Sequence, residues 1–140
     1  MVALEFFWNN NTRVESLPYS QYHIDTIITE SGGEPLHLTC VNGKAQVSER
    51  HKTWEMLKFM KASSHLPWLC IGDFNEVLLE SEHEGTQERS RSQIASFRDA
   101  VDVCGLVDLG FEGRRWTYEK KVARGSFCRV RLDRALACAE

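Results

Sequence analysis

The sequence predicts a mixed fold of the α/β or α+β type, in which strands and helices pack in layers. Three observations support this class: short alternating strands follow one another near the start, two segments of helical period interrupt the strands, and a short apolar run leads into an acidic turn. The chain has 140 residues, of which 42% are hydrophobic. It is long enough for a single domain, 1–140, and too short for two.

The first forty residues predict strands that are joined by short turns. Ala3–Trp8 is an apolar run, whereas the next three segments alternate between apolar and polar side chains: Thr12–Leu17, Tyr22–Glu30 and Leu36–Val41. Asparagine, proline and glycine residues separate these segments. Because strands joined by short turns pair with their sequence neighbours, this part predicts an antiparallel sheet.

The apolar period then changes from that of a strand to that of a helix. Trp54, Leu57 and Met60 recur at helical spacing. Ser48 is a residue type that caps helix N-termini, and the pattern fades near Ser63. These features predict a helix of about three turns that buries one face.

A short strand and a loop are predicted next. Trp68–Ile71 is too short for a helix and is followed at once by a turn, which is typical of a central strand buried on both faces. Glu76–Arg91 is acidic and weakly patterned. This second segment therefore predicts a long surface loop.

The rest of the chain predicts a second helix and three more strands. Ser90 and Gln93 have the spacing of a capping box, and Gly105 is a natural helix stop. The apolar residues between them recur at helical spacing: Ile94, Phe97, Val101 and Cys104. Three short strands separated by glycine-containing turns follow: Leu106–Leu109, Arg115–Tyr118 and Phe127–Leu132.

The composition excludes several classes of protein. No apolar run approaches the roughly 18 residues of a membrane span, and the first residues lack the pattern of a secretory signal. We therefore expect a nuclear or cytoplasmic protein without a membrane partner. The five cysteines include no CxxC pair, which predicts reduced thiols rather than a disulfide framework or a zinc site.

The charges are segregated along the chain. The formal net charge is −3, but residues 1–109 hold 9 Lys/Arg against 16 Asp/Glu, and residues 110–134 hold 8 against 3. We call residues 114–134 the basic strip. Lys and Arg beside aromatic rings favour nucleic-acid binding, because the cations neutralise phosphates and the rings stack on bases. The candidate contacts are Arg114, Arg115, Trp116, Lys120 and Lys121; a solvated hairpin is the alternative.

Asp73 and Asn75 follow the predicted central strand, where sites are common in sheet proteins. An Asp there can act as a general acid or base or as a metal ligand, and an Asn can hold a water or a phosphate oxygen. This pairing suits phosphodiester hydrolysis, which depends on charge stabilisation and an oriented water. The alternative is purely structural, because Asp and Asn both favour turns.

Asp133 stands in a strand-like segment, where strand propensity disfavours an acid. An ion pair with Arg131 or Arg134 is one interpretation, and orientation of another group is the other. The five histidines have no spacing that is typical of a metal site.

Several ordered segments carry a family resemblance. Gly72–Asn75, within Pro67–Leu78, reads GDFN. The other segments, in chain order, are Tyr22–Asp25, Arg50–Trp54, Cys104–Gly113, Trp116–Tyr118 and Arg131–Leu136. Together they resemble the endonuclease/exonuclease/phosphatase superfamily, in the form found in plant LINE-type (non-LTR) retrotransposons, with its C-L-x-D-L-G-F-x-G, F-T-W and R-L-D-R-A motifs.

The resemblance implies a partial four-layer α/β sandwich that hydrolyses DNA phosphodiesters with Mg²⁺, or with Mn²⁺ in its place. It assigns three catalytic roles. Asp73 is the expected acid/base, Asn75 is expected to orient the water or bind the phosphate, and Asp133 is expected to orient a catalytic histidine. Asp73 and Asn75 are also the expected metal contacts.

The chain departs from the family pattern in three ways. The family's strands that bear an Asn and a metal-binding Glu precede the matched region, and its Ser-Asp-His segment follows that region, so we expect a domain truncated at both ends. Where the family has Tyr-Gly, this chain has Asn42-Gly43, and Ala45 replaces a common proline. Three hypotheses stay open: a Mg²⁺-dependent DNA endonuclease, an inactive remnant that at most binds nucleic acid through the basic strip, or a non-functional fragment that does not fold stably.

Overall fold

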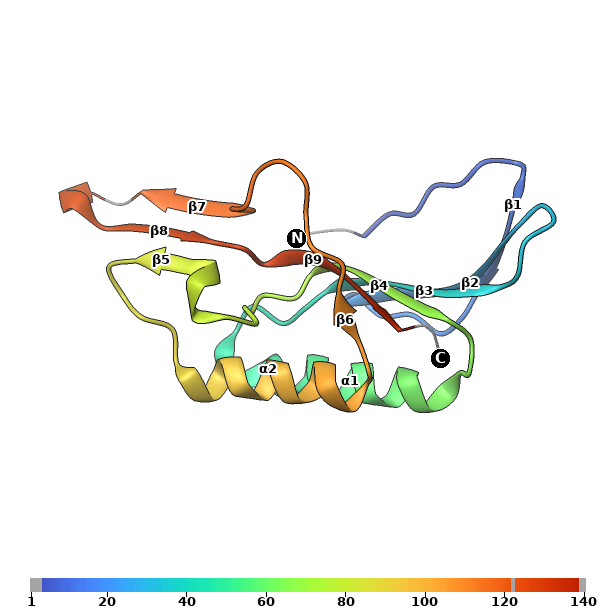
Figure 1. Ribbon diagram of the computed structural model, residues 1–140, viewed down its shortest axis with the longest axis horizontal. Helices are drawn as coiled ribbons and strands as arrows, with labels where there is room; N and C mark the ends of the chain where they lie inside the picture. The colour runs from blue at the N-terminus through green and yellow to red at the C-terminus, as the bar shows by residue number, and fades with distance from the viewer. Residues whose placement is uncertain (1–3, 122, 139–140) are drawn as a thin grey trace.

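The computed structural model describes residues 4–121 and 123–138. They form a six-stranded sheet in the order β1-β2-β3-β4-β9-β6 and a three-stranded sheet in the order β5-β8-β7. Both long helices lie on the same face of the larger sheet (Figure 1). The described helices are too short or too polar to cross a bilayer.

The first three strands form the predicted antiparallel meander. They are β1 (Thr12–Ser16), β2 (His23–Glu30) and β3 (Leu36–Asn42). The prediction of a strand over Ala3–Trp8 is wrong for residues 4–8, which are irregular, and Ala3 lies outside the described residues. An apolar run becomes a strand only where a neighbouring strand takes up its hydrogen bonds, and residues 4–8 pair with no described strand. Phe7 and Trp8 are exposed.

The first helix, α1 (Arg50–Ser63), carries the predicted buried face with Trp54, Leu57 and Met60. Ser48 is not its cap, because a 3₁₀ turn, η1 (Val47–Glu49), precedes the helix, and its N-cap, Glu49, makes no side-chain capping bond. The amide of Glu49 already donates to the carbonyl of Gln46 at 2.9 Å, so the tighter turn begins before the helix.

The strand β4 (Trp68–Asp73) lies at the centre of the larger sheet, parallel to β3 and antiparallel to β9 (Asp133–Cys138). The pairing of β4 with β3 is parallel because α1 connects the two strands, and a helical crossover returns the chain in the same direction. The strand is also not buried on both faces. Trp68 and Cys70 are buried, whereas Leu69 and Ile71 are only half-buried, because the described helices cover a single face.

The segment Glu76–Arg91 is not a surface loop. It contains the 3₁₀ turn η2 (Glu80–Glu82) and the strand β5 (His83–Gly85). Glu76 and Glu82 are buried although both are acidic. They are inside because arginines from other elements pair with them, which is the condition for burying a charge.

The second helix, α2 (Arg91–Val103), buries Ile94, Phe97 and Val101 as predicted. Its N-cap is Ser90, but the capping box with Gln93 does not form, and the Ser90 hydroxyl lies 2.8 Å from that of Ser92. Gly105 ends the helix with a φ of +64°. The rings of Trp54 and Phe97 stack with centroids 4.5 Å apart and join the two helices.

The C-terminal strands are displaced from their predicted positions. They are β6 (Val107–Asp108), β7 (Tyr118–Lys121), β8 (Phe127–Val130) and β9. The predicted strand Arg115–Tyr118 starts later, and Phe127–Leu132 ends before Arg131, where the chain passes from the smaller sheet to the larger. Arg131 stops β8 because its side chain turns inward to Glu82 and Asp108.

Candidate active site

Two glycines allow the ends of β3 and β4 to approach closely. Gly72 has a φ of +135°, and a Cβ atom on it would lie 2.0 Å from the carbonyl oxygen of Val41. A Cβ atom on Gly43 would lie 2.9 Å from the carbonyl oxygen of Phe74. Only glycine fits at these contacts. The close approach places Asn42 directly opposite Asp73.

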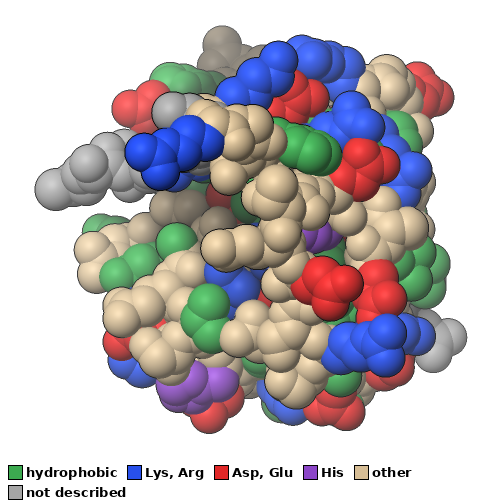
Figure 2. Space-filling view, turned by 90° about the vertical axis from the view of Figure 1, so that its left-hand side faces the viewer, with side chains coloured by type: hydrophobic (Ala, Val, Ile, Leu, Met, Phe, Trp, Pro, Cys, Tyr) green, Lys and Arg blue, Asp and Glu red, His purple; other side chains and the backbone are tan. Residues whose placement is uncertain are grey.

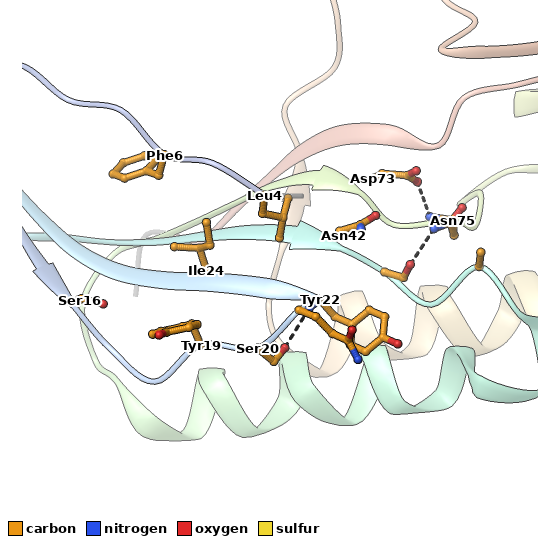
Figure 3. A pocket seen from close by; sticks show the side chains of 13 residues that line it. Leu4, Phe6, Ser16, Tyr19, Ser20, Tyr22, Ile24, Asn42, Asp73 and Asn75 are labelled. Atoms are coloured by element: carbon orange, nitrogen blue, oxygen red, sulfur yellow. Dashed lines mark hydrogen bonds between the residues drawn. The ribbon is translucent and has the colours of Figure 1, made fainter. Parts of the chain in front are cut away.

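Asp73 and Asn75 form a compact turn at the end of β4 (Figure 3). The amide of Asn75 donates to Asp73 Oδ1 at 2.8 Å, and Asn75 Nδ2 donates to the carbonyl of Gly43 at 2.7 Å. Asn75 has a φ of +55°, which Asn tolerates better than most residues. The structural interpretation of the two residues is therefore correct. Among the described residues, Asp73 Oδ2 and Asn75 Oδ1 still have no hydrogen-bond partner.

Asp133 begins β9 directly opposite Asp73, so the two side chains leave the same face of the sheet. Asp133 is exposed. The predicted ion pair with Arg131 or Arg134 is wrong, because both arginines bind Glu82 and Asp108 instead. The β register thus brings two acids together that are sixty residues apart in the sequence.

The surroundings of Asp73 favour its protonated form. Burial raises the pKa of Asp73, the amide of Asn75 opposes this, and the negative charge of Asp133 raises the pKa further. Arg50 and Arg89 act weakly in the opposite direction. A carboxylate whose pKa is raised is a stronger proton acceptor than an ordinary Asp, which favours a role as general base.

A cavity of about 780 Å³ opens beside this pair of acids (Figure 3). Asp73 and Asn75 form one part of its wall. The rest is mainly aromatic, aliphatic and small polar: Leu4, Phe6, Ser16, Tyr19, Ser20, Gln21, Tyr22, Ile24, Asn42, Gly43 and Ala45. Such a cavity can accept an apolar or aromatic group next to the acids.

Sequence reasoning missed two residues beside this cavity. The ammonium group of Lys44 lies 3.3 Å from the centroid of the Tyr22 ring, and Tyr22 lines the cavity. This cation–π pair places a positive charge and a phenol near Asn42, which lines the same cavity as Tyr22. The only signal in the sequence was a lysine two residues after the end of a strand, which is too common to identify a site.

Few side chains at the Asp73–Asn75 turn could bind a metal ion. The described residues contain no group of three or more His, Cys, Asp or Glu side chains that could hold a metal ion. Mg²⁺ is commonly bound by one or two carboxylates, with water and substrate phosphate as the other ligands. The carboxylates of Asp73 and Asp133, which lie opposite each other on β4 and β9, are a pair of this kind, and water and substrate would supply the remaining ligands.

The fold buries some cations of the basic strip and leaves others on the surface. Arg131 and Arg134 are buried in ion pairs, so they do not contribute to a surface. Lys and Arg side chains gather on the upper part of the molecular end that β7 and β8 form, with acidic side chains between them (Figure 2). Arg114, Lys120 and Lys121 are exposed there.

Two of the predicted nucleic-acid contacts are partly engaged within the chain. Arg115 donates to the carbonyl of Ser81, and its guanidinium lies 4.9 Å from the centroid of the Trp116 ring. Arg129 lies 4.8 Å from the same ring and pairs with Glu84. Trp116 is therefore held by two cations rather than left open for base stacking.

The arrangement of the larger sheet, with its helices and the acidic turn at the strand ends, is that of the DNase I-like endonuclease fold. Among solved structures, the chain is similar to the endonuclease domain of TRAS1, a telomere-specific non-LTR retrotransposon, with a TM-score of 0.71. The identity is 14%, and the likeness covers 95% of this chain and 58% of that chain. The predicted fold class is confirmed. No protein-family model and no curated protein matches the sequence.

Proposed function

We propose that the chain is part of an endonuclease domain that hydrolyses DNA phosphodiesters with Mg²⁺, and that Asp73, Asn75 and Asp133 carry the chemistry. The observation that supports this most directly is the pairing of Asp73 with Asp133 across β4 and β9, beside a cavity and on a DNase I-like sheet. The structural neighbour is the endonuclease domain of a non-LTR retrotransposon, and this chain spans 58% of its length. The plant LINE origin remains part of the proposal.

Each of the three residues has a separate task in this proposal. When bound, Mg²⁺ supplies charge stabilisation to the phosphate in the transition state. Asp73 Oδ2 is free of internal hydrogen bonds and takes or returns the proton of the attacking water. Asn75 Oδ1 accepts a hydrogen bond from that water, because its amide nitrogen is fixed on Gly43. Asp133 contributes the second negative charge that holds the cation.

A plasmid-nicking assay tests this function. The purified chain should convert supercoiled DNA to the open circular form with Mg²⁺ and not with EDTA. We expect Asp73→Asn to reduce the rate by a factor of about 10² to 10⁴, the usual contribution of a general acid or base. Asp102→Asn is the matched control, since Asp102 is an exposed acid on α2. Nicking that survives Asp73→Asn unchanged would overturn the proposal.

Binding without hydrolysis is the second candidate, and the exposed cations on and before β7 favour it. Because each phosphate contact releases counterions, DNA affinity should fall steeply as salt increases. The double variant Arg114→Ala with Arg115→Ala should bind more weakly and show a smaller salt slope. A fluorescence anisotropy titration at several salt concentrations measures both quantities, and affinity independent of salt would exclude this candidate.

A further inference from the structure

A second cavity, of about 650 Å³, lies beyond the Asp73–Asn75 turn, between the start of α1, the start of α2 and β8. Two arginines and a histidine line it: Arg50, His83 and Arg89. Most of its other side chains are polar and uncharged, namely Thr86, Gln87, Ser90, Gln93 and Ser126. Its one acid is Glu88, which is exposed. The remaining lining residues are Val47, Phe127 and Cys128. The cationic and polar side chains of the cavity can hold an anion with several oxygen atoms.

The two arginines are held in place by one buried carboxylate. Glu76 is fully buried, and its two oxygens accept from Arg50 Nη1 and Arg89 Nη1, each at 2.8 Å. Arg50 Nη2 donates to the carbonyl of Ala45 at 3.0 Å. Both guanidinium groups are therefore fixed before any ligand arrives. Binding then costs little side-chain conformational entropy at these two residues.

Arg89 keeps one edge of its guanidinium available. Its Nη1 atom also lies 3.5 Å from the carbonyl oxygen of Asn75, but Nε and Nη2 have no hydrogen-bond partner among the described residues. Among the described residues, the buried side-chain atoms without a hydrogen-bond partner belong to Arg50 and Arg134 and not to Arg89. Nε and Nη2 of Arg89 are therefore accessible to solvent. Nε and Nη2 together form the edge that binds two oxygens of one phosphate or carboxylate group.

The start of α2 adds further donors to the same cavity. Ser90 and Gln93, at the N-cap and in the first turn, both line it. The Ser90 side chain makes no capping bond, so the first amides of this 13-residue helix are not satisfied by a cap. The N-terminus of α2, which is the positive end of its dipole, therefore borders the cavity that Arg89 also lines.

We infer that this cavity binds a phosphate group, held by Arg89 together with the first turn of α2, and that a DNA strand lying across Asp73 supplies it. The DNA source rests on the proposed function, whereas the phosphate chemistry does not. The contact between Arg89 and the carbonyl of Asn75 makes the cavity adjacent to the acidic turn. A strand whose reacting phosphate lies at Asp73 thus places a neighbouring phosphate within reach of Arg89.

The first test titrates the full chain with inorganic phosphate and follows backbone and imidazole NMR signals. Burial, and then the positive charge of Arg89, lower the pKa of His83. A bound phosphate offsets the charge of Arg89, so the pKa of His83 should rise on binding. Saturable shifts of His83 and of the first amides of α2 support the inference, and the absence of saturable shifts overturns it.

Charge variants on the cavity wall test the location. Gln93→Glu and, on the exposed rim, Gln87→Glu should each weaken phosphate binding about tenfold, whereas Glu88→Gln should tighten it. Ala95→Glu makes the same charge change on an exposed position of α2 outside the cavity and should leave the affinity unchanged. Equal effects of Ala95→Glu and Gln87→Glu would mean a general charge effect and would overturn the assignment. Gln87 is exposed, so this comparison does not depend on Gln93→Glu folding.

A further pair of measurements shows whether the phosphate site and the proposed function fail separately. Affinity for a short DNA duplex is measured in EDTA, and nicking is measured with Mg²⁺. Gln87→Glu should weaken both phosphate and duplex binding. If phosphate binds as described but the wild-type chain does not nick DNA, the proposed function fails and the phosphate site stands. If the chain nicks DNA and Gln87→Glu changes neither phosphate nor duplex affinity, the phosphate site fails alone.

Discussion

Gly72 has a structural task that is distinct from the chemistry of its neighbour Asp73. The two lie next to each other in the GDFN segment, and Gly72 lets β3 approach β4 so closely that Asp73 is held at the edge of the cavity. The sequence indicated a turn and a site at these residues. It could not show the close approach, because the contact involves the backbone of Val41, which is distant along the chain.

Substitution of Gly72 should be far more costly than substitution of a glycine in open space. A Cβ atom on Gly72 would meet the oxygen of Val41 at 2.0 Å, so Gly72→Ala must move β3 or β4. We expect a loss of more than about 3 kcal/mol in the free energy of unfolding, measured by urea denaturation. Gly32→Ala is the control, since its φ is +76° but nothing lies within 4 Å, and it should cost about 1 kcal/mol. Similar losses for both variants would contradict the packing argument.

The raised pKa of Asp73 predicts a pH dependence of stability. A raised pKa in the folded state means that the folded protein favours the protonated carboxyl, so Asp73 lowers stability as pH rises above its ordinary pKa of 3.8. Asp73→Asn keeps an acceptor for the amide of Asn75 and removes the charge. At pH 7 the variant should be more stable, by roughly 0.2–1 kcal/mol, the scale of a like-charge pair across two strands.

This gain should shrink as the pH falls toward 3, where Asp73 in the wild type is protonated too. Thermal unfolding of both proteins between pH 3 and pH 7 measures it. A variant that is less stable at pH 7, or a difference that grows at low pH, would refute the account of Asp73.

At the scale of the elements, the R-L-D-R segment has two roles that the sequence alone did not separate. Arg131 and Arg134 face inward and join η2, β6 and β9 through Glu82 and Asp108. Asp133 lies between them and faces Asp73. The predicted strand Phe127–Leu132 extends β8 into this segment, whereas β8 ends at Val130 and a separate strand, β9, begins at Asp133. Only the distant acids Glu82 and Asp108 fix the inward direction of the two arginines.

Removing one acid from this ion cluster should strongly destabilise the fold. Glu82 accepts from both Arg131 Nη1 and Arg134 Nη1, and all three side chains are buried. Glu82→Gln leaves an uncompensated buried cation and should cost about 3–5 kcal/mol. Glu80→Gln removes an exposed partner of Arg91 and should cost less than about 1 kcal/mol. Urea denaturation compares the two, and equal costs would contradict the account.

The same cluster predicts sensitivity to acid. Burial alone would raise the pKa of Glu82, but the hydrogen bond and charge of Arg134 and the amides of Leu78 and Leu79 outweigh it and lower the pKa. Stability from Glu82 is therefore present above its ordinary pKa of 4.5 and is lost as pH falls through the lower value in the folded state. The Glu82→Gln variant should show a smaller loss between pH 5 and pH 2 than the wild type, and an equal loss would argue against this pairing.

For the molecule as a whole, local patterns predicted most elements but not their arrangement. The meander β1–β3 and both helices follow from periodicity, which depends on neighbours in sequence. The parallel pairing of β3 with β4 and the transfer of the chain from β8 to β9 depend on contacts between distant segments. The acidic segment after Asn75 resembles a loop in sequence, because local pattern does not show the ion pairs that bury its carboxylates; most of these reach arginines on α1, after β8 and on β9.

The candidate site also depends on contacts between segments that are distant in the sequence. The sequence predicts Asp73 and Asn75 as a pair on one turn and Asp133 separately, and the register of β4 and β9 brings Asp133 opposite Asp73. The basic strip was predicted as one surface, whereas two of its arginines are inside the protein. Arg50 and Arg89 were not predicted at all, because their shared partner, Glu76, had been placed in a solvated loop.

The measurement that tests the central claim most directly is the initial rate of Mg²⁺-dependent plasmid nicking across a double-mutant cycle of Asp73 and Asp133. If the two acids form one site, Asp73→Asn and Asp133→Asn should each remove most of the activity, and the double variant should be little slower than Asp73→Asn alone. Nicking by the wild type that Asp133→Asn leaves unchanged, or losses that simply add, would contradict the pairing. No nicking by the folded wild type with Mg²⁺ would contradict the proposed function.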